Sequence, residues 1–155
     1  MGASSRDLRL TGQTTVGGGT GGGLTPVPRT GWSATASSSA GGDVPLNMVD
    51  GVAGSRWSSG VPMAAGQSVT VDTGAVRSLA RITMDSAGSA ADYARGYQVF
   101  LSTGGVSWGS AVASGSGTGA LVTVDFAAQN ARYVKVVQTG TSTSWWSIAE
   151  FNAYG

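Results

Sequence analysis

The feature that most constrains the fold is a series of short segments in which apolar and polar residues alternate. A period of two places the apolar side chains on one face of a β-strand and the polar ones on the other. The segments are rich in Val, Ile, Thr, Tyr and Phe, which favour strands, and Gly, Ser, Asp and Asn fill the gaps between them. We expect strands at residues 32–36, 67–72, 79–84, 97–101, 121–126, 133–137 and 148–154.

Helices are disfavoured throughout the chain. No window has a sustained helical period, and the 26 glycines would each weaken a helix by roughly 1 kcal/mol relative to alanine. Seven or eight short strands at this spacing predict an all-β fold, a β-sandwich of the jelly-roll type.

The chain divides near residue 30. The glycine-rich stretch 17–23 and the proline-containing stretch 25–28 are typical of a flexible coil followed by a stiffer extended spacer. We therefore expect a linker or vector-derived tail at 1–30 and a single folded domain at 31–155. A linker implies a neighbouring domain upstream, and a tail without any neighbour is the alternative.

Composition narrows the classes of function. With 41% hydrophobic residues, a chain of 155 residues can form one real core. Its net charge is +1, only 11% of its residues are charged, and the basic residues beyond position 30 are scattered. We therefore expect no nucleic-acid partner. No apolar run approaches the roughly 20 residues that cross a bilayer, so we expect no membrane association either.

Most enzyme mechanisms are excluded by missing residue types. Without histidine and cysteine, the chain has no Ser-His-Asp triad, no thiol nucleophile and none of the usual zinc sites. A glycosidase needs only two carboxylates, but Asp72 and Asp125 stand at strand ends in sequences typical of turns. We expect no enzyme activity, with a small polysaccharide lyase as the remaining catalytic alternative.

Two adjacent tryptophans near the end of the chain are candidate ligand-binding residues. Trp145 and Trp146 follow a run of Ser and Thr at the rim of a strand, where at least one indole can face solvent. A flat, apolar ring with one polar end suits stacking against a sugar. The closing strand that follows contains the only glutamate, Glu150, which needs a compensating partner if it is buried.

A second candidate site lies in the loop at 47–55. Asp50 precedes Gly51, and Ser55 follows Asp50 by five residues, so carbonyl, carboxylate and hydroxyl oxygens can converge as ligands of calcium. Glu150 could complete such a site. The alternative is an Asx-turn, in which Asp50 accepts a hydrogen bond from its own backbone and no ion is bound.

The order of these motifs resembles the F5/8 type C, or discoidin, domain, whose bacterial branch is carbohydrate-binding module family 32. The resemblance covers residues 30–155. It is carried by residues 32–38, 47–51, 55–59, 71–74, 97–102, 108, 131–136 and 147–151.

The resemblance implies a jelly roll with one structural calcium ion. Its side-chain ligands would be Asp50, Ser55 and Glu150, and its backbone-carbonyl ligands would be Asn47, Val52 and Ala149. The chain departs from the family pattern twice, because Val52 replaces a common polar residue and Ser55 replaces a common threonine. Carbonyl ligation tolerates the first change, and the second keeps the hydroxyl.

The resemblance also assigns roles to aromatic residues. Trp57 and Trp108 match structural positions of the family, and Trp32 is expected in the core or at its seam. Trp145 and Trp146 lie at the binding apex, where we expect Trp145 to face outward and Trp146 to be buried.

The loop 85–96 is expected at the same apex. Its residues Asp92, Tyr93 and Arg95 would supply an acceptor, a ring and a forked donor for vicinal hydroxyls. The alternative role for Arg95 is an ion pair with Asp92 or Asp85.

A secreted, non-catalytic carbohydrate-binding module is the function that the resemblance implies. Its partner would be a polysaccharide, and it would be covalently linked to a catalytic domain of a glycoside hydrolase. A neutral glucan of fungal walls is the expected ligand, with chitosan or galactose as alternatives. The alternative class is a membrane- or protein-binding adhesion domain, for which Val61, Pro62 and Met63 are the only apolar cluster of the expected kind.

Overall fold

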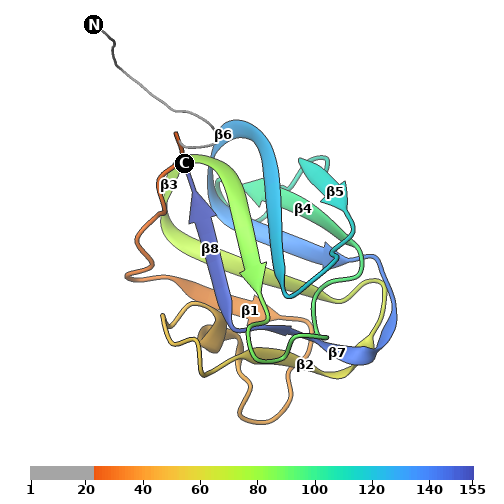
Figure 1. Cartoon of the computed structure of the whole chain (residues 1–155). Coiled ribbons are helices and arrows are strands. Elements are labelled where there is room, and N and C mark those ends of the chain that lie inside the picture. Colours follow the sequence, from red (N-terminus) through yellow and green to blue (C-terminus); the bar gives the residue numbers. More distant parts are fainter. Residues whose placement is uncertain (1–22) are drawn as a thin grey trace, which may run out of the picture.

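The structure is a computed structural model that describes residues 23–155, and these residues form a β-sandwich (Figure 1). They contain no α-helix, only one short 3₁₀ turn, so the all-β, jelly-roll prediction is confirmed. The elements are β1 (Ser33–Ala36), η2 (Pro45–Met48), β2 (Trp57–Met63), β3 (Ser68–Asp85), β4 (Tyr97–Ser102), β5 (Ala113–Gly115), β6 (Leu121–Gln138), β7 (Ser142–Ile148) and β8 (Glu150–Tyr154).

Two long strands hold the sandwich together. The first half of β3 pairs with β1 and with the second half of β6, while its second half pairs with β8 and with the first half of β6. The pairing of β3 with β6 shifts register between Asp72 and Arg77, and again between Leu79 and Arg81. Because such irregularities bend a strand, each of the two strands contributes to both walls of the sandwich. The sequence therefore predicted four separate strands where the structure has two.

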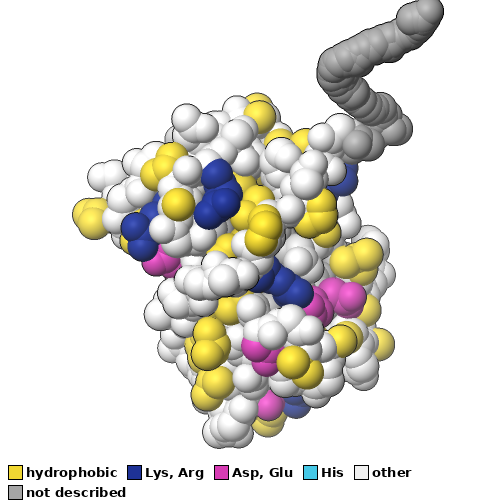
Figure 2. All heavy atoms as spheres, turned by 90° about the vertical axis from the view of Figure 1, so that its left-hand side faces the viewer, with side chains coloured by type: hydrophobic (Ala, Val, Ile, Leu, Met, Phe, Trp, Pro, Cys, Tyr) yellow, Lys and Arg dark blue, Asp and Glu magenta, His cyan; other side chains and the backbone are white. Residues whose placement is uncertain are grey.

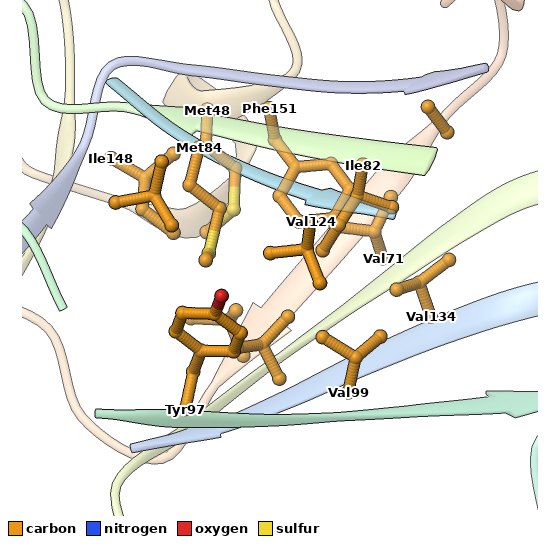
Figure 3. Close-up of a cluster of buried hydrophobic side chains, with 14 of the residues drawn as sticks. Met48, Val71, Ile82, Met84, Tyr97, Val99, Val124, Val134, Ile148 and Phe151 are labelled. Carbon is orange, nitrogen blue, oxygen red and sulfur yellow. The ribbon is translucent and has the colours of Figure 1, made fainter. Parts of the chain in front are cut away.

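The core lies between the two walls (Figure 3). Val71, Val99 and Val134 come from the wall of β3, β4 and β6, and Ile82 and Phe151 face them from the wall that contains β8. All five side chains are fully buried, as the period-two pattern requires.

A separate two-stranded sheet of β2 and β7 closes one end of the sandwich. The sequence did not predict β2, because its Ser, Gly and Pro residues are typical of a loop. Gly60 has a φ of 73°, and a Cβ there would lie 2.9 Å from the backbone nitrogen of Ala40, so only glycine fits. Strand β5 and most of β7 were also missing from the predicted strands.

The last residues of the predicted linker are part of the fold. Thr25 and Gly155 exchange two backbone hydrogen bonds of 3.1 and 3.0 Å, and the amide of Val27 donates to the carbonyl of Ala153 at 2.8 Å. This short segment therefore runs antiparallel along β8, and it brings the start of the described chain next to the C-terminus (Figure 1). Most of the predicted linker lies outside the described residues.

Candidate functional site

Strand β7 separates the two tryptophans because successive side chains of a strand point to opposite sides. Trp146 is fully buried and packs edge to face against Trp57, with ring centroids 5.1 Å apart. Trp145 keeps 38% of its surface exposed and lies opposite Pro62 of β2. The expected orientation of the pair is confirmed, and Trp146 must be removed from the candidate ligand-binding residues, because a buried indole has no free face.

The loop between β3 and β4 is fastened to β7 by Asp92. The Ser147 amide donates to the Asp92 carbonyl at 3.0 Å, and the Ser147 hydroxyl donates to the Asp92 carboxylate at 2.7 Å. Arg56 donates to the same carboxylate oxygen at 3.1 Å, and also to Asp43 at 3.2 Å. Sequence reasoning did not identify Arg56, whose only signal was its place beside Trp57.

These contacts change the expected role of Asp92. Its Oδ2 atom already accepts two hydrogen bonds, and it shares the charge of Arg56 with Asp43, so the carboxylate orders the loop. Its Oδ1 atom makes no hydrogen bond within the described residues, so this oxygen alone is left for the expected contact with a ligand hydroxyl.

Arg95 and Tyr93 form a stacked pair at the end of the same loop. The Arg95 guanidinium lies 3.8 Å from the centre of the Tyr93 ring, and its Nη1 atom donates to the carbonyls of Ala91 and Tyr93. Neither Asp92 nor Asp85 pairs with Arg95 in the described residues, so the alternative ion pair is not formed. Within these residues the Nε and Nη2 groups of Arg95 make no hydrogen bond, which leaves them for a ligand.

The candidate metal loop follows η2 and is preformed. The Asp50 carboxylate accepts hydrogen bonds from the Val52 amide at 2.9 Å and from the Ser55 hydroxyl at 2.6 Å. The same hydroxyl lies 3.2 Å from the Val52 carbonyl oxygen. The Asx-turn is thus present, and three oxygens converge in it as well. The side-chain amide of Asn47 donates hydrogen bonds to the carbonyls of Gly42 and Arg56, which stabilises the loop.

Glu150 begins β8, directly after Ala149, and its compensating partner is Arg29. The Arg29 Nη2 atom lies 2.8 Å from Glu150 Oε1, while Oε2 is buried and has no hydrogen-bond partner among the described residues. A Cβ at Gly51 would lie 3.9 Å from the same Nη2 atom, so Arg29 stands between the metal loop and β8. Arg29 was placed in the linker by sequence reasoning, and no local signal connects it to a residue 121 positions away.

Other aromatic and apolar residues depart from expectation. Trp57 and Trp32 are buried as expected, but Trp108 is only half-buried and lies outside the core. Lys135 covers its ring, with the ammonium 4.5 Å from the ring centre. Met63 is buried, which removes one of the three residues of the expected apolar cluster for membrane or protein binding.

Charges are few and dispersed. On the face shown in Figure 2, Lys and Arg side chains stand in small separate groups, several of them beside Asp or Glu. Arg132 donates two hydrogen bonds to Asp72, which hold the pKa of this carboxyl below its usual range, and the Gly74 amide acts in the same direction. No helix in the described part of the chain is long and apolar enough to cross a membrane.

Comparison with solved structures shows which proteins share this architecture. A galactose-bound family 32 carbohydrate-binding module of Clostridium perfringens NanJ is 25% identical, with a TM-score of 0.75 over 85% of this chain and 99% of that one. Chitosan-binding module 2 of a Paenibacillus chitosanase/glucanase, solved with chitotriose, is 32% identical, with a TM-score of 0.68 over 79% and 95%. The family 32 module of AlyQ, solved with 4,5-unsaturated mannuronic acid, is 28% identical, with a TM-score of 0.63 over 78% and 92%.

A comparison with curated protein sequences found no match. The family model for the F5/8 type C domain matches residues 33–151, which is most of the folded part of the chain. With this match and the shared architecture, the chain belongs to the F5/8 type C domain family.

Proposed function

We propose that this domain is a non-catalytic carbohydrate-binding module whose ligand stacks on Trp145. The proposal rests on the different positions of two adjacent indoles. Trp146 is buried in the core against Trp57, whereas Trp145 is exposed at the end of the sandwich. Trp145 provides a half-exposed apolar ring on β7, and the loop that carries the unbonded donors of Arg95 is joined to the same strand through the Asp92–Ser147 hydrogen bonds, so the two together could supply an apolar surface and direction for hydroxyl groups.

The absence of catalysis fits the state of the acidic residues. Every carboxylate in the described residues accepts a hydrogen bond from the domain itself. Their donors belong to Arg56 and Ser58 for Asp43, Ser55 and Val52 for Asp50, Arg132 and Gly74 for Asp72, Ala87 for Asp85, Arg56 and Ser147 for Asp92, Arg81 for Asp125, and Arg29 for Glu150. Each carboxylate therefore has a structural partner in the domain, which a binding module without an acid–base pair allows.

The ligand is a neutral polysaccharide, with a fungal-wall glucan as the first choice. A polycation such as chitosan is the first alternative, because Asp43 and Asp92 share the single positive charge of Arg56, which leaves this cluster with one net negative charge. A polyanion would require a basic cluster, whereas among residues 23–155 only Arg95 lies over the Tyr93 ring. Chitosan and galactose remain the alternatives because solved relatives bind chitotriose and galactose.

The role of the module is to hold a covalently attached glycoside hydrolase on this polysaccharide outside the cell. Attachment raises the effective concentration of the enzyme at its substrate even when each binding site is weak. Support comes from the chitosan-binding relative, which derives from a chitosanase/glucanase.

The test is co-sedimentation of the full chain with insoluble curdlan (a β-1,3-glucan), chitosan and galactose-agarose. We expect retention on curdlan that is lost in Trp145→Ala. Retention on chitosan alone, or on galactose-agarose alone, would identify that sugar as the ligand in place of the glucan. No retention on any of the three, together with binding to lipid vesicles or release of reducing sugar, would refute it.

A structural calcium ion is the second part of the proposal. The donor set fits, because the oxygens of Asp50, Ser55 and Val52 converge and Glu150 Oε2 is buried without a partner. Asn47 and Ala149 would add backbone carbonyls. The ion would link the loop after η2 to β8 through the free Glu150 Oε2, next to the Arg29 guanidinium that holds Oε1. A ligand that binds only the folded state stabilises it by mass action.

Thermal unfolding of the full chain with calcium and with a strong chelator tests this part. We expect a lower melting temperature with the chelator, and no difference in Glu150→Gln. Equal melting temperatures in both conditions for the unmodified chain would show that the Asx-turn and Arg29 complete the structure without an ion.

A further inference from the structure

The outer face of the large sheet has a hollow that takes no part in the candidate site at β7. Its volume is about 230 Å³, and it is lined by Ser33, Ala34, Thr35, Thr70, Asp72 and Tyr133. Strand register explains this grouping: Ser33, Asp72 and Tyr133 lie side by side across β1, β3 and β6, and Thr35 lies beside Thr70. The intervening residues Val71 and Val134 point into the core.

Hydroxyl groups line this hollow without using their hydrogen-bonding capacity. The hydroxyls of Ser33, Thr35, Thr70 and Tyr133 make no hydrogen bond to any described residue. Each can donate one hydrogen bond and accept others. The hollow therefore presents donors and acceptors of the kind that recognise another polyhydroxyl compound.

The hollow carries one charged group, and that charge is balanced. The Asp72 carboxylate receives hydrogen bonds of 2.8 and 3.0 Å from Arg132, and one of 2.8 Å from the Gly74 amide. Since the ion pair is complete, the charged residue of the lining does not select a charged ligand, and Lys135, opposite Thr70 on the same face, lies over the rings of Phe100 and Trp108. A neutral ligand matches the hollow better.

Aromatic rings extend the same face. Tyr133 borders the hollow, and its ring is backed by Gly105, where a Cβ would lie 3.1 Å from a ring carbon. Lys135 follows Tyr133 by two residues on β6 and therefore lies on the same face. It is opposite Phe100 of β4, and its ammonium lies over the rings of Phe100 and Trp108. Trp108 was expected in the core, and core packing does not account for its half-exposed position.

We propose that this hollow is a second saccharide site, in which a neutral sugar ring packs against Tyr133 and its hydroxyls bond to Thr35, Thr70 and the edge of the Asp72–Arg132 pair. The class of ligand rests on the function proposed above. At about 230 Å³ the hollow lies below the roughly 300–1,000 Å³ of sites for drug-sized ligands, which fits a single sugar residue of a longer chain.

Two sites on different faces would let one domain contact two segments of a polysaccharide. Linking two weak sites raises the apparent affinity by roughly 10²–10⁴ when both bind together. A second site would therefore affect binding to the insoluble polymer far more than binding to a short oligosaccharide.

The test is an NMR titration of the ¹⁵N-labelled full chain with laminarihexaose, a soluble neutral glucan fragment, for the unmodified protein and for Trp145→Ala. We expect two groups of shifted amides, one at β7 and the 85–96 loop and one at residues 33–35, 70–72 and 133. The second group should persist in Trp145→Ala.

A variant that fills the hollow completes the test. Thr35 is exposed on an edge strand, so Thr35→Arg blocks the hollow without disturbing the core, and Thr123→Arg places the same side chain on an exposed part of β6 as the control. We expect Thr35→Arg to abolish the second group of shifts and to weaken binding to curdlan at least about tenfold. Thr123→Arg should change neither.

The outcomes separate the two proposals. Shifts at β7 alone would overturn the second site and leave the proposed function standing. Shifts at the sheet face that disappear in Trp145→Ala would also overturn it, because they would report one extended site. No shifts with laminarihexaose, chitotriose or galactose would refute the proposed function and the second site together.

Discussion

The adjacent indoles of β7 allow stability and binding to be separated by two single substitutions. Trp146 is completely buried against Trp57, so Trp146→Ala costs about 3–5 kcal/mol for the lost burial and about 0.5–1.5 more for the edge-to-face pair. That is comparable with the whole stability of many domains, which is about 5–15 kcal/mol.

Trp145→Ala should be milder. With 38% of the residue exposed, the same cost scaled by the buried fraction gives an upper value of about 2–3 kcal/mol. At about 4 °C per kcal/mol for a domain of this size, the two variants should differ in melting temperature by roughly 6–14 °C.

Urea unfolding followed by circular dichroism measures both variants without depending on tryptophan fluorescence. Co-sedimentation with curdlan then shows that folded Trp145→Ala no longer binds, whereas Trp145→Phe, which keeps a flat ring, retains part of the binding. The reasoning fails if Trp146→Ala is as stable as Trp145→Ala, or if folded Trp145→Ala still binds all three polysaccharides.

Three further predictions concern the supports of the fold. Arg29→Ala leaves the mostly buried carboxylate of Glu150 unpaired, so the free energy of unfolding, measured with urea in the presence of a chelator, should fall by about 1–3 kcal/mol. An unchanged free energy of unfolding would show that the ion pair contributes nothing. Asp72 has a lowered pKa, so its stabilisation is fully present above the unfolded pKa of about 3.9 and is lost as pH falls through the lower folded value. Asp72→Asn should therefore remove about 0.2–1 kcal/mol at pH 7 and progressively less as the pH falls below 3.9, and a loss that does not change with pH would contradict this. Gly140→Ala places a Cβ 2.7 Å from Arg95 Cβ and should cost about 1–3 kcal/mol by thermal unfolding, whereas Gly119→Ala, with open space around it, should cost little; equal effects would contradict the close approach.

Some properties of this protein follow from the sequence alone. Alternating segments such as 68–72 and 133–137 specify strands and their buried faces, because the two faces of a strand are set by its own residues. The all-β class follows from equally local information, and the Asx-turn at Asp50 was one of the two alternatives that its local sequence offered, whereas the burial of Trp57 was expected from the family resemblance. The outward orientation of Trp145 follows once Trp146 is assigned to the core.

Other properties were decided only by the tertiary structure. Arg29 meets Glu150, and Arg56 joins Asp43 to Asp92, through contacts between residues that the chain brings together only when it closes into a sandwich. The outer position of Trp108, the hollow beside Tyr133 and the fusion of predicted strands into β3 and β6 depend on register between strands far apart in sequence. A local pattern gives the face on which a side chain lies, but the partner on that face is set by strand pairing, which no single segment encodes.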